Sequence, residues 1–167
     1  MSLAGYLQRF PKVTLIQNFL KTHCALIFLI PLAFLLIFTG LDDTVLQADE
    51  GADTFISTTI LKYGYPKHSD GSNYTMPEGD AFGGIFLYRT WFPYYIQSTA
   101  LLLFGQSNFS ARLPFAILGV FSIWSLYSFT LRWTNRKTIA FLASLLLATS
   151  VPALLYFRTA RYVAIPI

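Results

Sequence analysis

The sequence predicts an all-α integral membrane protein, and three observations lead to that fold class. Hydrophobic residues make up 54% of the 167 residues and charged residues only 12%, about half the share found in soluble domains. The mean hydropathy of +0.52 points the same way. All eight acidic residues lie between Asp42 and Asp80, whereas basic residues flank the apolar runs. This composition excludes a soluble globular domain, a disordered chain and a nucleic-acid-binding protein.

Three apolar runs, residues 24–41, 113–131 and 139–157, predict complete transmembrane helices. As a helix, the first run is about 27 Å long, close to the ~30 Å thickness of the hydrocarbon core. Pro31 is expected to bend it. A secretory signal peptide is the alternative for this run, but the run is long and no small-residue cleavage site follows it. We expect residues 158–167 to form an outer segment and the start of a fourth transmembrane helix.

The basic residues predict the orientation of these helices. Residues 1–23 form a basic N-terminus, and residues 132–138 form a basic break between two apolar runs. Because positively charged loops stay on the cytoplasmic side, both segments are expected to be cytoplasmic. Residues 42–112 then form an extracytoplasmic loop that carries every acidic residue. The predicted location is multi-pass in the plasma (inner) membrane, if the organism is prokaryotic.

The extracytoplasmic loop has helical signals of its own, and its length of about 70 residues is too great for a simple connector. Apolar residues at i, i+4 spacing predict a helix near residues 53–63, with Gly64 as its end. A second helix is predicted near residues 93–104, between Pro93 and Gly105. That apolar run is too short to span a membrane. We therefore expect both helices to be amphipathic and to lie at the membrane interface.

The pair Asp49-Glu50 is the main candidate for catalysis, since it follows the first span and precedes the first predicted loop helix. A carboxylate at the membrane surface can act as a general base or bind a divalent cation. The alternative is that Asp49, Glu50 and Asp53 cap the helix that follows, because acidic side chains favour a helix N-terminus.

Arg158 and Arg161 are the main candidates for binding an anion, at the outer end of the third span. Arginine presents several donors to a phosphate, and the phosphate of a lipid head group would lie at this depth. The alternative is that these side chains only extend toward the interface, as cationic residues at helix ends do. Arg112 has the same two interpretations.

No metal site can be recognised from spacing. His23 and His68 lie far apart, on opposite predicted sides of the membrane, and neither has ligand spacing to a cysteine or another histidine. Cys24 is most simply a small apolar residue of the first span. The identity of any metal or other cofactor is thus left open, with a divalent cation as one possibility.

Several segments together resemble a known family. They are ADEGADTFISTTILKYGYPKHSDG in the outer loop, LLLFGQSNFSARLPFAILGVFSIWSLYSF into the second span and LLYFRTARYVA after the third. In this order, over about residues 20–167, the chain resembles the N-terminal portion of the GT-C superfamily of membrane glycosyltransferases. The resemblance is greatest to the protein-mannosyltransferase-like and aminoarabinose-transferase-like branch. The Asp-Glu pair and the ARLP segment are its most specific parts.

The resemblance implies an enzyme that transfers a sugar from a polyprenyl-phosphate carrier, with inversion, to an acceptor on the extracytoplasmic side. By motif, Asp49 corresponds to the family's catalytic carboxylate and Glu50 to its neighbour, while Arg158 and Arg161 lie near the donor phosphate. The implied partners are the polyprenyl-phosphate-linked sugar, membrane lipid, and a protein, lipid or glycan acceptor, with no nucleic acid. Because family members usually have more spans, the chain alone is expected to be inactive. The alternative is a non-catalytic membrane subunit or truncated fragment that binds a partner or the lipid carrier.

Overall fold

A computed structural model describes the backbone of residues 11–75 and 84–161, and their side chains from residue 24 onward. Regular structure in these ranges is helical, apart from two isolated β-bridges in the segment after α3. The helices in order are α2 (Pro11–Phe38), α3 (Ala48–Tyr63), α4 (Phe92–Phe104), α5 (Asn108–Thr134), α6 (Lys137–Thr149) and α7 (Val151–Phe157). The all-α fold class is therefore confirmed for the described residues.

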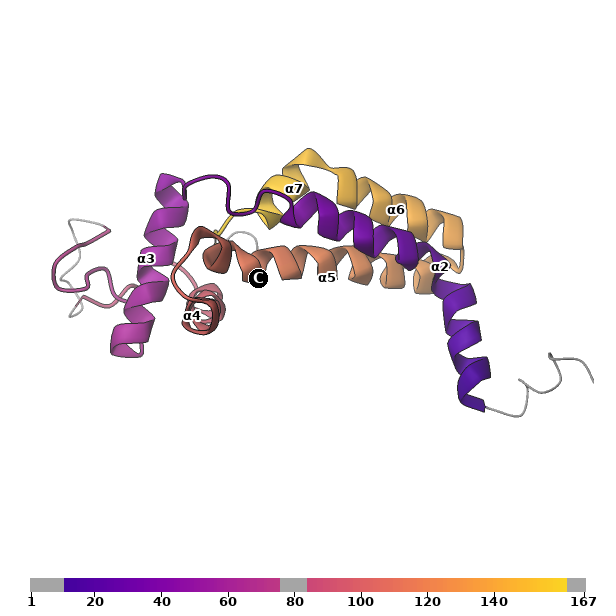
Figure 1. Cartoon of the computed structure of the whole chain (residues 1–167), viewed down its shortest axis with the longest axis horizontal. Coiled ribbons are helices and arrows are strands. Elements are labelled where there is room, and N and C mark those ends of the chain that lie inside the picture. The colour runs from indigo at the N-terminus through magenta and orange to yellow at the C-terminus, as the bar shows by residue number, and fades with distance from the viewer. Residues whose placement is uncertain (1–10, 76–83, 162–167) are drawn as a thin grey trace, which may run out of the picture.

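Helices α2, α5 and α6 form an elongated bundle, and α3 and α4 lie at one end of it (Figure 1). Apolar side chains from the three long helices fill the bundle in two clusters, which centre on Ile37 with Ile123 and on Leu29 with Tyr127. The buried residues of α6 are Ala140, Ser144 and Ala148. Their spacing of four places small side chains on one face of α6, so its neighbours approach closely.

The bundle differs from the three complete spans that the sequence predicts. Only α5, Asn108–Thr134, is by itself long and apolar enough to cross a membrane among the described residues. The expected span 139–157 is broken into α6 and α7, which meet at an angle of 65°. Ser150 ends α6 in an extended conformation and Pro152 lies in the first turn of α7. Proline favours that position and cannot supply the amide needed inside a helix, which explains the break.

The first expected span also differs from its predicted form. Side chains of α2 are described from residue 24 onward. The apolar stretch in this part of the helix, Cys24–Phe38, is shorter than a membrane span. Helix α2 ends at Phe38, three residues before the predicted end at residue 41, and Pro31 lies inside it. Of the expected fourth helix, residues 158–161 are non-helical, and residues 162–167 lie outside the described part of the chain.

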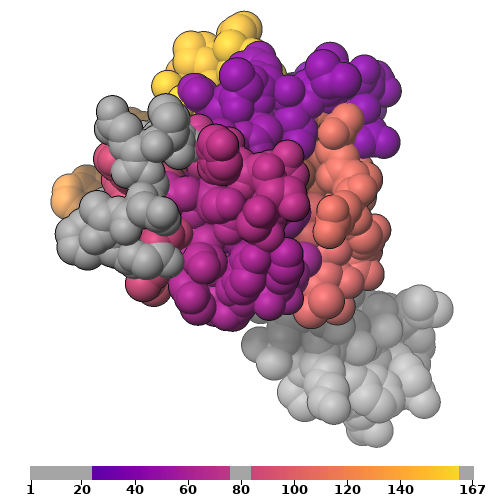
Figure 2. Space-filling view, turned by 90° about the vertical axis from the view of Figure 1, so that its left-hand side faces the viewer, coloured from indigo at the N-terminus to yellow at the C-terminus, as the bar shows by residue number. Residues whose placement is uncertain are grey.

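Helices α3 and α4 pack against each other in a cluster of Ile56, Ile60 and Tyr94, which Phe86 from the segment before α4 completes. Helix α3 begins five residues earlier than the sequence predicts and ends at Gly64, whose φ of 81° is a conformation that glycine adopts without a steric penalty. Figure 2 shows this end of the molecule, with α3 and the turn after it in the centre of the face and the connection after α2 above. This arrangement presents the N-terminus of α3 toward the end of the bundle.

Candidate functional site

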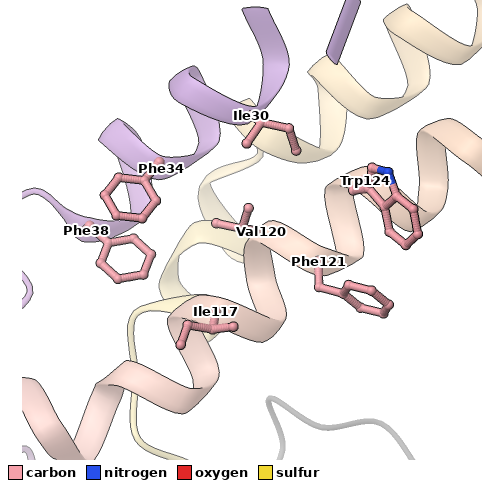
Figure 3. Close-up of a pocket in the computed structure, with 7 residues that line it drawn as sticks. All are labelled: Ile30, Phe34, Phe38, Ile117, Val120, Phe121 and Trp124. Atoms are coloured by element: carbon pink, nitrogen blue, oxygen red, sulfur yellow. The ribbon is translucent and has the colours of Figure 1, made fainter. Parts of the chain in front are cut away.

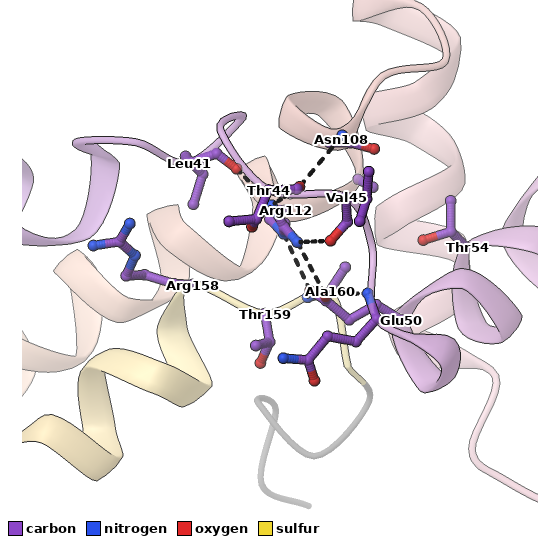
Figure 4. A network of polar contacts seen from close by, with 12 residues as sticks. Leu41, Thr44, Val45, Glu50, Thr54, Asn108, Arg112, Arg158, Thr159 and Ala160 are labelled. Carbon is purple, nitrogen blue, oxygen red and sulfur yellow. Dashed lines mark hydrogen bonds and ion pairs between the residues drawn. The ribbon is translucent and has the colours of Figure 1, made fainter.

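Four segments meet at the end of the bundle nearest α3 (Figure 4). They are the connection that follows α2, the first turn of α3, the first two turns of α5 and residues 158–161 after α7. Each contributes a polar group, and the contacts join residues as far apart as 122 positions in the sequence. The candidate residues from the sequence analysis are therefore brought to one place, together with Arg112.

Glu50 is the buried centre of this network. Its side chain is 1% exposed and that of Arg112 is 5% exposed. Oε1 accepts from the Nε of Arg112 at 3.1 Å and from the backbone N–H of Ala160 at 2.7 Å. Oε2 accepts from Nη2 of Arg112 at 2.9 Å and from the backbone N–H of Gln47 at 3.0 Å. A carboxylate has about four acceptor sites, so Glu50 has no site left for a substrate proton.

The pKa of Glu50 reflects two opposing effects. Burial alone raises the pKa, because it disfavours the charged form. The hydrogen bonds from Arg112, Ala160 and Gln47, together with the positive charge of Arg112, outweigh burial and hold the pKa of Glu50 below its usual value of 4.5. Glu50 is thus a permanently ionised structural group at neutral pH.

Arg112 points inward and binds protein groups with all three of its guanidinium nitrogens. Besides the contacts to Glu50, Nη1 donates to the carbonyl oxygens of Leu41 at 2.8 Å and Thr44 at 2.9 Å, and Nη2 donates to that of Val45 at 3.2 Å. Neither sequence-based interpretation of Arg112, phosphate binding or extension to the interface, describes these contacts. Instead, Arg112 fixes the connection after α2 against α5 and α3.

Asp49 lies next to Glu50 in the chain but in a different environment. Its side chain is 59% exposed and accepts from Nη2 of Arg161 at 2.7 Å, and the side chain of Arg161 is 32% exposed. The adjacent carboxylates of the Asp-Glu pair therefore have separate surroundings, one sealed and one open to solvent. Only Asp49 is accessible to a substrate.

Arg158 caps the C-terminal end of α2. Its Nη2 donates to the carbonyl oxygens of Thr39 at 2.7 Å and Gly40 at 3.4 Å, and its Nη1 donates to that of Leu36 at 3.2 Å. The last carbonyls of a helix lack partners inside the helix and carry partial negative charge, which a guanidinium satisfies. The two arginines that the sequence groups together therefore have different contacts, Arg158 with backbone and Arg161 with Asp49.

A second buried charged cluster lies further along α3 and was not identified from the sequence. Asp53, 1% exposed, forms an ion pair with Arg89 and accepts from the hydroxyl of Tyr94 at 3.0 Å. Burial and the charge of Asp53 raise the pKa of Tyr94. Arg89 and Tyr94 follow Asp53 by 36 and 41 residues, so no local pattern indicates these contacts. The cluster attaches α4 and the segment before it to α3.

No three histidine, cysteine or acidic side chains come together as a metal site within the described ranges. His68 is buried and packs edge-on against Phe86, and His23 lies outside the side chains described. A divalent cation at Asp49 remains a prediction, which a comparison of sugar transfer with and without a chelator tests.

Comparison with known proteins adds one match. Residues 89–164 match the family model described as dolichyl-phosphate-mannose-protein mannosyltransferase. Over this stretch, the chain is similar to membrane glycosyltransferases of the GT-C type. The match confirms the resemblance found in the sequence. No curated protein and no solved structure matches the chain.

The matched residues include Arg112, Arg158 and Arg161, whereas Asp49 and Glu50 precede them. The structure connects the two parts through the pairs Arg112–Glu50 and Arg161–Asp49. The acidic pair of the outer loop is therefore in contact with the part of the chain that matches the family model.

Proposed function

We propose that this chain carries catalytic groups of a membrane glycosyltransferase that uses a polyprenyl-phosphate-linked sugar. The sugar is transferred to a protein, lipid or glycan acceptor on the extracytoplasmic side of the membrane, which is the plasma membrane in a prokaryote. The observation that supports this proposal most directly is the accessible Asp49 beside Arg161, on a framework fixed by the buried Glu50–Arg112 pair. The family match over residues 89–164 supports the same class of activity.

In the proposed mechanism, Asp49 takes the proton from an acceptor hydroxyl as its oxygen attacks the anomeric carbon of the sugar. A new carbon–oxygen bond forms on one face, and the bond to the phosphate breaks on the other, so the anomeric centre is inverted. The polyprenyl phosphate leaves with the bonding electrons. Arg161 stabilises the charge that develops on the phosphate, while Arg158 holds the end of α2 in place.

The decisive variant is Asp49→Asn, which removes the proton acceptor and keeps nearly the same shape. Loss of a general base is expected to reduce transfer by about 10²–10⁴-fold. The measurement is transfer of radiolabelled sugar from polyprenyl-phosphate mannose in membranes of cells that express the protein from its native gene. Expression level and melting temperature are compared in parallel.

The matched control is Asp43→Asn, an exposed acidic residue of the connection after α2, for which transfer is expected to stay near the wild-type rate. A folded Asp49→Asn variant with near wild-type transfer would exclude Asp49 as the base. That result would favour the non-catalytic alternative, in which the chain binds a partner or the lipid carrier.

A further inference from the structure

We infer that Asp49 and Arg161 form an exchange pair, in which a phosphate group takes the guanidinium of Arg161 and releases the carboxylate of Asp49. This inference rests on the proposed function and adds a regulatory step to the same site. The carboxylate is held by Arg161 in the absence of donor and becomes available to the acceptor hydroxyl when the donor phosphate binds.

The first argument is the contrast between two neighbouring ion pairs. In the Glu50–Arg112 pair, both side chains are almost fully buried and every oxygen of the carboxylate is saturated. In the Asp49–Arg161 pair, 59% and 32% of the side chains are exposed. Water weakens an exposed pair, and such pairs contribute little net free energy. The open pair can therefore be broken by a ligand at small cost, whereas the sealed pair cannot.

The second argument is that Asp49 satisfies Arg161 incompletely. Asp49 accepts only from Nη2, and the Nε atom of Arg161 is buried without a hydrogen-bond partner among the described residues. A buried donor without a partner is unfavourable. A carboxylate can also accept from two guanidinium nitrogens, as Glu50 does from Arg112, but Asp49 accepts from Nη2 of Arg161 alone. A phosphate has more acceptor oxygens than a carboxylate, so it can accept from Nη2 and Nε together and satisfy the donor that Asp49 leaves unpaired.

The third argument is that the backbone is fixed at Ala160 and at Glu50, each of which is adjacent in the chain to one member of the pair. Ala160, which precedes Arg161, donates its N–H to the carboxylate of Glu50, which follows Asp49. The buried carboxylate of Glu50 therefore links two backbone positions, Glu50 and Ala160 (Figure 4). These positions are next in the chain to Asp49 and Arg161, whose side chains exchange partners. The exchange consequently needs only side-chain rotations, which are fast compared with turnover.

The test measures phosphate binding separately from sugar transfer. The chain is reconstituted in phosphatidylcholine nanodiscs and titrated with polyprenyl phosphate that carries no sugar. Removing the competing carboxylate by Asp49→Asn is expected to increase affinity by about two- to fivefold, the range of exposed ion pairs. Arg161→Gln is expected to weaken binding, and Arg161→Lys to restore it only in part because lysine lacks the planar fork.

The double variant Asp49→Asn with Arg161→Gln decides whether the two residues act together. We expect it to bind polyprenyl phosphate like Arg161→Gln alone, because no guanidinium is left to be released. Asp43→Asn serves as the control for loss of one exposed negative charge and is expected to leave affinity unchanged. An affinity that is unchanged in Asp49→Asn, or a gain that persists without Arg161, would overturn the exchange.

Two further titrations identify the source of the phosphate group. Inorganic phosphate is used in one titration and phosphatidylglycerol in the other, each in place of polyprenyl phosphate. The pair recognises the ligand that binds more tightly to Asp49→Asn and more weakly to Arg161→Gln. The outcome is independent of the proposed base. Loss of transfer in Asp49→Asn with unchanged phosphate affinity keeps the base and rejects the exchange. A gain in affinity with near wild-type transfer supports the exchange and rejects the base.

Discussion

The adjacent residues Asp49 and Glu50 show how one sequence motif divides into two roles. The sequence alone allows either catalysis or helix capping for the pair as a unit. In the structure, Glu50 accepts from the N–H of Gln47 in the first turn of α3, which is a capping contact, and binds Arg112 in the interior. Side chains one position apart on a helix point about 100° apart, so Asp49 faces solvent. The sequence does not show which side of the helix each residue faces. That difference in direction gives the two carboxylates their separate environments, buried for Glu50 and exposed for Asp49.

Glu50→Ala is expected to destabilise the protein strongly. The variant leaves the guanidinium of Arg112 buried without its ionic partner, and breaking a buried pair in this way costs about 3–5 kcal/mol. The measurement is unfolding in detergent with Asp43→Asn as a reference, expected to change stability by no more than about 0.5 kcal/mol. A loss below about 1 kcal/mol for Glu50→Ala would mean that water reaches the pair.

The lowered pKa of Glu50 predicts a pH dependence of stability. In the folded state, the pKa lies below the usual 4.5, so the unfolded chain binds a proton first as the pH falls. The stabilisation is then fully present at neutral pH and is lost as the pH drops below about 4.5, toward the folded pKa. Melting temperatures between pH 6 and pH 3 are expected to fall more for the wild type than for Glu50→Gln, which has no such proton to gain. Parallel curves for the two proteins would contradict the assignment.

At the scale of elements, glycine and proline made the ends of α3 and α4 predictable. Gly64 and Gly105 end the two helices, and Pro93 lies in the first turn of α4. Apolar spacing predicts the start of α3 five residues too late, because the capping contacts come from Gln47 and Glu50 and follow no apolar spacing. The charge-free run 139–157 predicts one continuous span, although Thr149, Ser150 and Pro152 interrupt it at the point where the structure places the break.

The amide of Gln97 joins three helices, which neither composition nor periodicity could reveal. Its Oε1 accepts from the hydroxyl of Ser57 at 2.6 Å. Its Nε2 donates to Thr54 Oγ1 at 3.0 Å and to the carbonyl of Ala111 at 3.1 Å. These contacts hold α4 between α3 and α5. Their partners on α3 follow Asp49 by more than one helical turn.

Gln97→Leu is expected to lower stability by about 1–3 kcal/mol, because it keeps the size of the side chain but leaves buried polar partners unsatisfied. Gln106→Leu is the matched control, since Gln106 is exposed after the end of α4. Chemical unfolding of both variants in the same detergent gives the comparison. Equal stability of the two variants would show that water replaces the amide.

At the scale of the whole molecule, the candidate site depends on which ends of the helices lie together. Arg158, after α7, binds the last carbonyls of α2, and Arg112, in the second turn of α5, binds the connection that follows α2. The end of α2, the start of α5 and the end of α7 therefore meet at one end of the bundle. The basic turn between α5 and α6 lies at the opposite end (Figure 1). This separation is the one that the charge distribution predicts for a chain that crosses a membrane.

The apolar side chains between α2 and α5 support a location in lipid. Ile30, Phe34, Phe38, Ile117 and Trp124 are among the residues that line a surface cavity of about 340 Å³ between these helices (Figure 3). Phe34, Ile117 and Trp124 are among the exposed large apolar residues. In water such a surface would promote aggregation, whereas acyl chains of lipid solvate it without cost.

Cysteine labelling tests the orientation of the two ends. Single cysteines are placed at Ser72, in the exposed turn after α3, and at Thr138, in the exposed first turn of α6, in a Cys24→Ala background. We expect an impermeant thiol reagent to modify Ser72→Cys in intact cells and Thr138→Cys only after permeabilisation, because basic segments stay on the cytoplasmic side. If both cysteines react in intact cells, or both only after permeabilisation, the two ends of the bundle lie on one side of the membrane and the predicted topology is wrong.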